Sequence, residues 1–337
     1  MFQAFVLAAG LGTRLRPLTD HRPKPLVPVC GVPLLAYSLQ LCARHGLNRV
    51  VVNAHWLSEQ IEAWAGLQET VNVTVSTEKP DVLGTGGGLR KVMRELDPVF
   101  AVLNGDVLHD VDLTALIGAV RPGGAAMALR PYPGEEQKYG IVAADDQNTV
   151  ARLTSLARTE PEGTLHEDTH FTGIHAMDRE ALNLVPPDEF ACIIRTAYVN
   201  LIPDRKVAGV RYPGAWLDAG DPAAYLGANL DVLSQRVGLA LDPMPRAAYA
   251  RRANGDIVGT RPQAIPDTVE RQGPLWIGDG VEFQGSARLE ESILGPGAKV
   301  PSGTSLTRTV VWDGCTVPPG DHVDAIVFPG GVLTPLG

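Results

Sequence analysis

The feature that most constrains this chain is its opening stretch, in which a short apolar run passes directly into glycine. Phe5 to Ala9 is apolar, and Gly10 and Gly12 follow at once. Such a run is typical of a strand buried on both faces of a sheet. Glycine then lets the backbone turn sharply and come close to a ligand. Consecutive N–H groups in a turn of this kind attract oxyanions, so the stretch predicts a phosphate-binding loop.

Cationic residues follow the glycine turn. Arg14 and Arg16 add fixed positive charge, and arginine can bind a phosphate group through two N–H donors. Lys24 stands between Pro23 and Pro25, whose rings restrict the backbone on both sides. An ordinary α/β protein would account for the strand and the turn, but not for the lysine held between prolines. The stretch therefore favours a site that handles phosphate groups.

The residues of this stretch resemble a known family motif. Leu-Ala-Ala-Gly-Leu-Gly-Thr-Arg-Leu-Arg-Pro-Leu-Thr, followed by Pro-Lys-Pro-Leu-Val-Pro-Val, is similar to the N-terminal motif of the sugar-1-phosphate nucleotidylyltransferases. These enzymes join a nucleoside triphosphate to a sugar 1-phosphate and release pyrophosphate. Two other phosphate loops fit less well, because G-x-x-x-x-G-K-[ST] is absent and Gly10-x-Gly12 lacks the third glycine of a dinucleotide fingerprint.

The resemblance implies roles for the residues of this stretch. It makes Arg14 and Lys24 catalytic, with the arginine on the triphosphate and the lysine where the attacking phosphate meets the α-phosphate. It assigns the nucleotide to the loop, through Leu7, Ala9, Gly10, Gly12 and Thr13.

Length and composition exclude several other classes. The 337 residues suit two domains, and a hydrophobic content of 45% is that of a globular protein. A net charge of −9 argues against a nucleic-acid partner. No apolar run approaches the ~20 residues that span a bilayer, so we expect no membrane partner. Four scattered cysteines without a C-x-x-C pair, and no targeting segment, predict reduced thiols in the cytoplasm.

The spacing of apolar residues predicts an α/β fold. Helical spacing covers 32–45 and 57–64, whereas 50–52 and 71–75 have the pattern of strands. Strands that alternate with helices indicate a Rossmann-like mixed, mostly parallel sheet flanked by helices. Ligands of such sheets bind beyond the carboxyl ends of the strands. We expect a catalytic domain over residues 1–236.

A second glycine-rich segment, Gly84 to Gly88, lies ahead of a helical stretch. A glycine turn that opens a helix can present N–H groups to an anion, and the resemblance implies that Gly84, Thr85 and Gly86 bind the nucleotide. Upstream, Glu78 could accept from both the N1–H and the amino group of guanine. A solvated loop acid is the alternative for Glu78.

Two aspartates end short apolar runs. Asp106 closes Phe-Ala-Val-Leu-Asn-Gly-Asp, and Asp218 lies in Trp-Leu-Asp-Ala-Gly-Asp. The family presents a Gly-Asp and a Trp-x-Asp-x-Gly of this kind to one metal ion, so the resemblance implies that both residues bind Mg²⁺ and that Asp106 is also catalytic. Magnesium is usually held by one or two carboxylates with phosphate oxygens and waters. A turn-forming role is the alternative for Asp106.

The sugar-binding elements are only partly recognisable. Lys-Tyr-Gly-Ile-Val around Gly140 and Phe-Thr-Gly-Ile-His around Gly173 resemble sugar-facing segments of the family. Many relatives carry a Phe-x-Glu-Lys-Pro element between the two, and this chain has none. In its place stands Ala-Arg-Thr-Glu-Pro, in which Arg158 is our candidate for the missing lysine.

The segment from His166 to His170 matches H-E-x-x-H, the two-histidine zinc pattern of metalloproteases. That chemistry needs both histidines one turn apart on a helix. The segment instead runs into a strand-like stretch, 171–176, so we do not expect zinc hydrolysis.

The spacing of apolar residues changes in the C-terminal part of the chain. A helix is expected from Pro222, and 237–274 is rich in Pro and Arg without a clear period, which suggests a linker. From 275 to 337 an aliphatic residue recurs about every six positions among Gly, Pro and Asp, as in a hexapeptide-repeat left-handed β-helix. Such a solenoid has open ends, so we expect a homo-oligomer, which light scattering would test.

The substrates remain open at this point. The glycine-rich segment, Glu78 and the appended β-helix look most like the mannose-1-phosphate guanylyltransferase branch, which makes GDP-mannose from GTP and mannose 1-phosphate. A uridylyl- or thymidylyltransferase acting on glucose 1-phosphate or an amino sugar 1-phosphate is the alternative. A non-catalytic regulatory subunit is disfavoured by the intact charged residues, and an additional acyltransferase by the short repeat segment, where His322 is the one histidine.

Overall fold

The structure is a computed structural model that describes residues 3–132, 139–237, 239, 249–251, 256–259 and 265–335. It divides into two compact units, between which the chain passes several times. The first unit comprises Met1–Leu11, Ser38–Gly105 and His109–Trp216, and the second comprises Gly12–Tyr37, Asp106–Leu108 and Leu217–Gly337. The predicted domain boundaries at 236 and 274 stay predictions.

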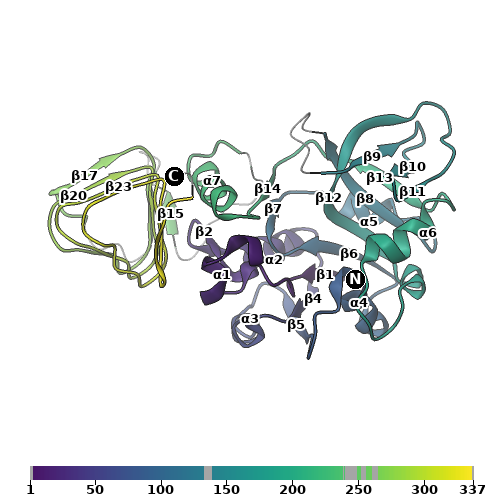
Figure 1. Cartoon of the computed structure of the whole chain (residues 1–337), viewed down its shortest axis with the longest axis horizontal. Helices are drawn as coiled ribbons and strands as arrows, with labels where there is room; N and C mark the ends of the chain where they lie inside the picture. The colour runs from purple at the N-terminus through teal and green to yellow at the C-terminus, as the bar shows by residue number, and fades with distance from the viewer. Residues whose placement is uncertain are drawn as a thin grey trace. The chain divides into compact units, whose positions relative to one another are not determined.

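A ten-stranded mixed sheet forms the centre of the first unit (Figure 1). Its strands are β1 (Gln3–Leu7), β4 (Arg49–Ala54), β5 (Asn72–Thr77), β6 (Val99–Asn104), β8 (Ala125–Pro131), β9 (Ile141–Ala144), β10 (Val150–Leu153), β11 (Ala157–Arg158), β12 (His166–Asp178) and β13 (Val207–Arg211). The main path is β11-β10-β9-β12-β6-β1-β4-β5, and β8 pairs with β12 and β13. Strands β6, β1, β4 and β5 are parallel neighbours, whereas β12 is antiparallel to β6, β8 and β9. The predicted mixed α/β sheet is confirmed. It is not mostly parallel as expected, because four of its described strand pairs are parallel and five are antiparallel.

The apolar run of the opening stretch lies in the middle of this sheet. Phe5 on β1, Val51 on β4 and Phe100 on β6 are all at most 1% exposed and belong to one core cluster. Strand β1 has β4 along one edge and β6 along the other. Ala4, Phe5 and Val6, whose side chains alternate between the two faces of the sheet, are all 0% exposed, so both faces of the strand are covered. The glycine loop therefore leaves the carboxyl end of a central strand, as predicted.

Helices connect the strands of the sheet. They are α2 (Leu34–Arg44), α3 (Ser58–Ala65), α4 (Gly84–Lys91), α5 (Leu113–Gly118) and α6 (Val199–Leu201), with short turns η3 (Met93–Glu95), η4 (Arg179–Leu184) and η5 (Ile194–Tyr198). None of the helices in the described ranges has the length and apolarity that crossing a membrane requires.

Two predicted helices are shorter in the structure. The stretch 32–45 becomes helical only at Leu34, because Val32 and Pro33 pair with Pro28 and Val29 as a small antiparallel ribbon. The stretch 190–201, which is also helix-like in sequence, becomes helical only at Ile194. Ahead of it, the Ala191 backbone pairs with Leu83 and with the start of α4, which keeps this segment extended.

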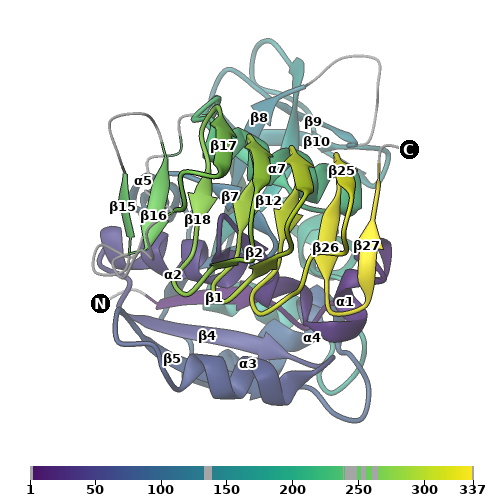
Figure 2. The same ribbon diagram turned by 90° about the vertical axis from the view of Figure 1, so that its left-hand side faces the viewer.

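The second unit contains coils of short parallel strands, which confirms the predicted β-helix. One stack is β18 (Trp276–Ile277), β21 (Ile293–Leu294), β24 (Val310–Val311) and β26 (Ile326–Phe328), extended by β15 (Tyr249–Arg251), β16 (Ile257–Gly259) and β27 (Gly331–Leu333). A second is β17 (Val269–Gln272), β20 (Ala287–Glu290), β23 (Thr304–Thr307) and β25 (Asp321–Val323), and β19 (Glu282–Phe283) pairs with β22 (Lys299–Val300). Figure 2 shows these strands side by side.

Register explains the repeat in the sequence. Ile277, Leu294, Val311 and Val327 are successive partners along the first stack, and all are buried in one apolar cluster. Each of these aliphatic residues therefore points into the interior of its coil and lies directly over its partner in the preceding coil. The predicted linker, 237–274, lies partly outside the described residues, and its described parts form β15, β16 and β17.

The remaining elements of the second unit are η1 (Thr13–Leu15), α1 (Leu18–His21), η2 (Lys24–Leu26), β2 (Pro28–Val29), β3 (Val32–Pro33), β7 (Val107–His109), β14 (Trp216–Asp218) and α7 (Pro222–Leu233). Helix α7 begins at Pro222 as predicted, and the Asp221 side chain caps it by accepting from the Ala224 N–H at 2.9 Å.

The β-helix is attached to the segment that carries Lys24. Trp312 Nε1 donates to the Tyr225 hydroxyl at 3.0 Å, and this hydroxyl donates to the Pro28 carbonyl at 2.6 Å. The indole of Trp276 packs directly over Gly31. These contacts fasten the coils to α7 and to residues 28–31 within one compact unit.

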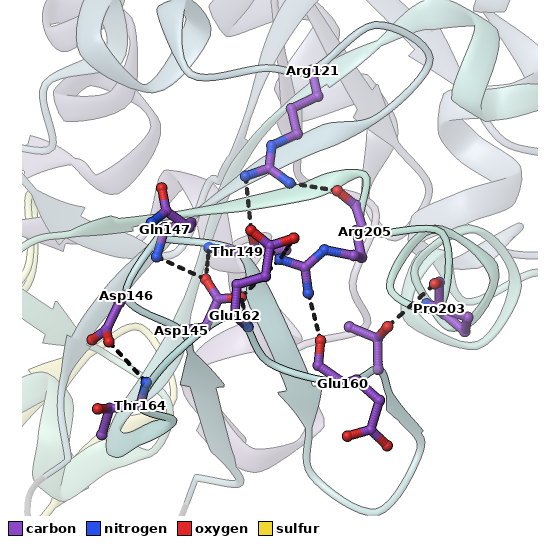
Figure 3. A network of polar contacts seen from close by, with 11 residues as sticks. Arg121, Asp145, Asp146, Gln147, Thr149, Glu160, Glu162, Thr164, Pro203 and Arg205 are labelled. Atoms are coloured by element: carbon purple, nitrogen blue, oxygen red, sulfur yellow. Dashed lines mark hydrogen bonds and ion pairs between the residues drawn. The ribbon is translucent and has the colours of Figure 1, made fainter.

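In the first unit, one buried carboxylate organises several loops (Figure 3). The Asp145 side chain is 0% exposed and accepts from the N–H groups of Gln147 (3.0 Å), Thr149 (2.9 Å) and Glu162 (2.9 Å). It also accepts from the Arg205 guanidinium at 2.9 Å. The network joins the β9–β10 turn to the 160–164 loop and to the segment before β13.

The pH dependence of stability follows from this network. Burial by itself raises the pKa of Asp145, but the N–H donors of Glu162 and Thr149 and the Arg205 guanidinium outweigh burial and lower this pKa to about 2. Because the unfolded value is about 3.9, the ionised carboxylate stabilises the fold above about pH 4. That contribution is lost as the pH falls towards 2. We expect Asp145→Asn to unfold more easily at pH 7 and to lose part of the decline between pH 4 and 2, measured by denaturant titrations. An unchanged acid profile would contradict this.

The packing of Trp276 on Gly31 predicts a strong effect of one methyl group. A Cβ on Gly31 would lie 2.0 Å from the indole, and the φ of this residue is +70°. We expect Gly31→Ala to lower the free energy of unfolding by about 3 kcal/mol or more, from backbone strain and overpacking together. Gly314→Ala is the matched control, because φ is +68° and no atom lies within 4 Å of its Cβ position. It should lose only about 1–2 kcal/mol, and equal losses in urea titrations would refute the packing effect.

Candidate active site

Three charged side chains from distant parts of the sequence meet within the second unit. The Lys24 ammonium lies 2.6 Å from Asp106 Oδ2 and 4.0 Å from Asp218 Oδ1. The lysine side chain is only 8% exposed, whereas those of Asp106 and Asp218 are 31% and 22% exposed. A buried cation thus faces two carboxylates that remain open to solvent.

Local structure explains how each of the three is positioned. Pro23 is extended and Lys24 starts η2, where its carbonyl accepts from the Val27 N–H at 3.1 Å. Asp106 follows the end of β6 and precedes β7, and Asp218 ends β14, the strand that pairs with β7. The pairing of these two short strands brings the aspartates together.

Arg14 extends from η1 in the same unit, directly after Gly12. Gly12 has a φ of +63°, and its carbonyl accepts from the Thr19 hydroxyl at 2.8 Å, which fixes the turn. Arg14 is exposed. Its Nη2 and the carboxylate of Asp218 both lie within 3.2 Å of the position that a Cβ on Gly220 would occupy. Because Gly220 has no side chain, Arg14 and Asp218 can both lie close to its backbone.

The part of the glycine loop in the first unit is held by an asparagine. The N–H groups of Ala8 and Ala9 donate to Asn53 Oδ1 at 2.6 and 3.3 Å. The Leu7 carbonyl accepts from the Gly105 N–H at 2.9 Å, and Gly10 is exposed. Sequence reasoning did not single out Asn53, although it ends an apolar strand just as Asp106 does.

Glu78 is buried, so it is not a solvated loop acid. It is 0% exposed, Oε1 accepts from Asn53 Nδ2 at 2.8 Å, and Oε2 accepts from the Leu83 N–H at 2.7 Å. The contact with guanine stays a prediction, and both oxygens of the carboxylate bind groups of the protein itself.

The glycines at the start of α4 serve close packing. The N–H groups of Gly86 and Gly87 donate to the Ala191 carbonyl at 2.8 and 3.2 Å. A Cβ on Gly86 would lie 3.0 Å from the Ile193 nitrogen, and one on Gly88 would lie 2.5 Å from Glu78 Oε1. The Thr85 hydroxyl accepts from the Ile193 N–H at 3.0 Å. The role of Gly84, Thr85 and Gly86 in binding the nucleotide stays a prediction.

The predicted sugar segments come together around three aromatic rings of the first unit. Tyr139, next to Gly140, stacks on His170 with centroids 4.9 Å apart, and the edge of each ring meets Trp216. Trp216 Nε1 donates to the Thr172 carbonyl at 3.0 Å, next to Gly173. Burial lowers the pKa of His170. Lys138, the first residue of the Gly140 motif, lies outside the described residues.

Two other predicted elements lie apart from this cluster. Arg158 is exposed on β11, the outermost strand of the main sheet path, and β10 and β9 separate it from β12. His166 and His170 both lie on β12, so the H-E-x-x-H segment is extended, as expected. His166 bonds to Asp146 Oδ1 at 2.8 Å.

The donor set around Lys24 fits a magnesium ion. Asp106 and Asp218 offer oxygen ligands, both are partly exposed, and both lie within 4.0 Å of one cationic atom. Magnesium takes one or two carboxylates and leaves further positions to phosphate oxygens and water. The described residues contain no group of three or more His, Cys, Asp or Glu side chains with metal-binding geometry, so substrate and water would supply the other ligands.

The family of the chain follows from comparison with known proteins. The family model described as nucleotidyl transferase matches residues 3–235, a range that includes every residue of the candidate active site. The chain therefore belongs to the nucleotidyl transferase family. As the resemblance predicts, it is an enzyme of the sugar-1-phosphate nucleotidylyltransferase class.

Individual relatives differ in the names of their substrates. The chain is 29% identical to a UTP–glucose-1-phosphate uridylyltransferase of Synechocystis sp., over 97% of this chain and 87% of that protein. It is 28% identical to a mannose-1-phosphate guanylyltransferase of Mycobacterium tuberculosis, over 90% and 83%. It is 31% identical to an N-acetylmuramate alpha-1-phosphate uridylyltransferase of Caulobacter vibrioides, over 67% and 95%.

A solved structure shares the fold. The crystal structure of HddC from Yersinia pseudotuberculosis superimposes with a TM-score of 0.54 at 22% identity, covering 68% of this chain and 98% of that chain. This similarity shows the fold alone.

Proposed function

We propose that the chain joins a nucleoside triphosphate to a sugar 1-phosphate and releases pyrophosphate. The convergence of Lys24, Asp106 and Asp218 carries this proposal. A sugar 1-phosphate is anionic at neutral pH, so its oxygen attacks the α-phosphorus without a general base. A new O–P bond forms, the bond from the α-phosphorus to the bridging oxygen breaks, and pyrophosphate takes that electron pair. Catalysis then consists of alignment and charge neutralisation.

Each charged group has a distinct task in this reaction. Lys24 offsets the negative charge where the two phosphate groups meet, and its buried stem fixes the position of that charge. Arg14, exposed at the end of the glycine turn, binds the triphosphate tail. Asp106 and Asp218 would hold Mg²⁺, which supplies charge neutralisation on the phosphates when bound. Gly140 and Gly173 are the proposed sugar contacts, and Arg158 stays a proposed contact although it lies on β11, apart from the aromatic cluster.

As the finer form of the proposal, the substrates are GTP and mannose 1-phosphate, with GDP-mannose as the product. The guanylyltransferase of Mycobacterium tuberculosis matches 90% of this chain, so the similarity extends beyond the catalytic residues. We further propose a homo-oligomer in the cytoplasm. In keeping with a reducing compartment, the four cysteines, all of them described, form no disulfide.

A second candidate is UTP with glucose 1-phosphate or an amino sugar 1-phosphate. One observation favours it over GTP: both oxygens of Glu78, the carboxylate proposed to read guanine, accept hydrogen bonds from Asn53 and Leu83. The uridylyltransferase of Synechocystis also matches 97% of the chain. A non-catalytic regulatory subunit would need no lysine buried against two aspartates.

Loss of the charged groups should abolish turnover without unfolding the protein. We expect Lys24→Ala and Asp106→Ala each to lower kcat by about 100-fold or more, because each removes charge stabilisation at the reacting phosphates. Pyrophosphate release measures the rate, and circular dichroism checks the fold. The control is Arg308→Ala, which breaks the Arg308–Asp324 ion pair on the β-helix. Near wild-type rates for either site variant would refute the assigned roles.

The substrates are testable with one grid of assays. Pyrophosphate release is measured for the common nucleoside triphosphates against mannose, glucose, N-acetylglucosamine and N-acetylmuramate 1-phosphates, with magnesium and with a chelator. The proposal expects pyrophosphate release only when the metal is present, with the highest rate for GTP and mannose 1-phosphate. A UTP maximum selects the second candidate, and no release with any pair rejects the proposed function.

A further inference from the structure

One buried polar pair connects the two nucleotide segments of the first unit. Asn53 is the last residue but one of β4 and is 2% exposed, and Glu78 follows β5 and is 0% exposed. Strands β4 and β5 pair in parallel register up to Ala54 and Thr77, which sets the two residues beside each other at the carboxyl edge of the sheet. Their side chains bond at 2.8 Å.

Each member of the pair holds a different loop. Asn53 Oδ1 accepts from the N–H groups of Ala8 and Ala9, in the first glycine loop. Glu78 Oε2 accepts from the N–H of Leu83, which caps α4. A chain of hydrogen bonds therefore runs from the first glycine loop through both side chains to the second glycine segment.

The surroundings leave the pair no freedom to move. A Cβ on Gly88 would lie 2.5 Å from Glu78 Oε1 and 2.9 Å from Asn53 Nδ2, so the glycine is needed for the helix to close over the pair. The Glu78 N–H donates to the Ala54 carbonyl at 2.7 Å, and its carbonyl bonds to His55 Nδ1 at 2.9 Å. Both the backbone and the side chain of Glu78 are therefore fixed.

We propose that Asn53 and Glu78 are positioning residues, which set the spacing of the two glycine segments for the nucleotide without contacting it. The inference rests on the proposed function, because it takes both segments as nucleotide contacts. On this view Glu78 does not read the base. The pair favours binding of every nucleoside triphosphate by the same factor.

The polarity of the bonds provides a reversible test. A carboxylate only accepts, whereas an amide has one accepting and one donating end. In Glu78→Gln, an N–H must therefore face either Asn53 Nδ2 or the Leu83 N–H. In Asn53→Asp, two carboxylates face each other. In the double variant, the glutamine at 78 accepts from the Leu83 N–H and donates to the aspartate at 53. That aspartate still accepts from the N–H groups of Ala8 and Ala9. Every hydrogen bond is therefore restored, and only the bond between the two side chains has its donor and acceptor exchanged.

The experiment compares wild type, both single variants and the double variant. Titration calorimetry gives the Kd of GTP and of UTP without sugar phosphate, and pyrophosphate release gives KM and kcat. We expect each single variant to raise Kd and KM about tenfold for both nucleotides, since an unsatisfied buried group costs about that much. The double variant should return to within about threefold of wild type.

Hydrogen–deuterium exchange provides a readout that does not depend on activity. The amides of 8–9 and of 83 should exchange faster in the single variants and regain protection in the double variant. Asp145→Asn is the matched control, since it also removes a buried carboxylate of the first unit but contacts neither segment. It should lower the melting temperature and leave the Kd for both nucleotides unchanged.

Three results would overturn the inference. The first is a loss confined to GTP in Glu78→Gln, which would make Glu78 a base-reading residue. The second is a lower melting temperature with wild-type Kd and KM, as in the control. The third is a double variant as impaired as the singles. Failure of the proposed function is separate, because it would appear as a wild-type protein that releases no pyrophosphate in the substrate grid.

Discussion

The contact of the buried Lys24 ammonium with two aspartates is the interaction on which the candidate active site depends. Removing an ammonium group from water is costly unless carboxylates lie close to it, and Asp106 and Asp218 are the carboxylates that Lys24 faces. The three residues come from distant parts of the sequence that belong to one compact unit. The same two carboxylates stay partly exposed, at 31% and 22%.

The two glycine-rich segments use glycine for different physical reasons. Gly12 has a positive φ and forms a turn that few other residues adopt. Gly86 and Gly88 are needed because backbone and side-chain atoms of other segments lie where a Cβ would be. Composition alone gives both segments the same appearance, and only the fold shows which atoms lie beside each glycine.

Much of the candidate site could be predicted because it lies at strand ends. Asp106 follows an apolar run, and a polar residue at the carboxyl end of a buried strand is recognisable from the sequence. Asn53 has the same position, but its function depends on Glu78, 25 residues away in the chain. The place of Arg158 apart from the aromatic cluster was not predictable either, because it depends on where a short edge strand adds to the sheet.

By itself, the sequence determined the local features of this protein. They are the buried strand before Gly10, the start of α7 at Pro222 and the repeat that stacks into coils, since these depend on neighbours a few residues apart. Tertiary structure alone decided which polar groups are already bonded inside the protein. The register of β4 and β5 decides whether Glu78 is an exposed loop acid or a buried carboxylate that bonds to Asn53 and Leu83. The physical reason is that hydrogen bonds between distant segments exist only once the chain has brought their donors and acceptors together.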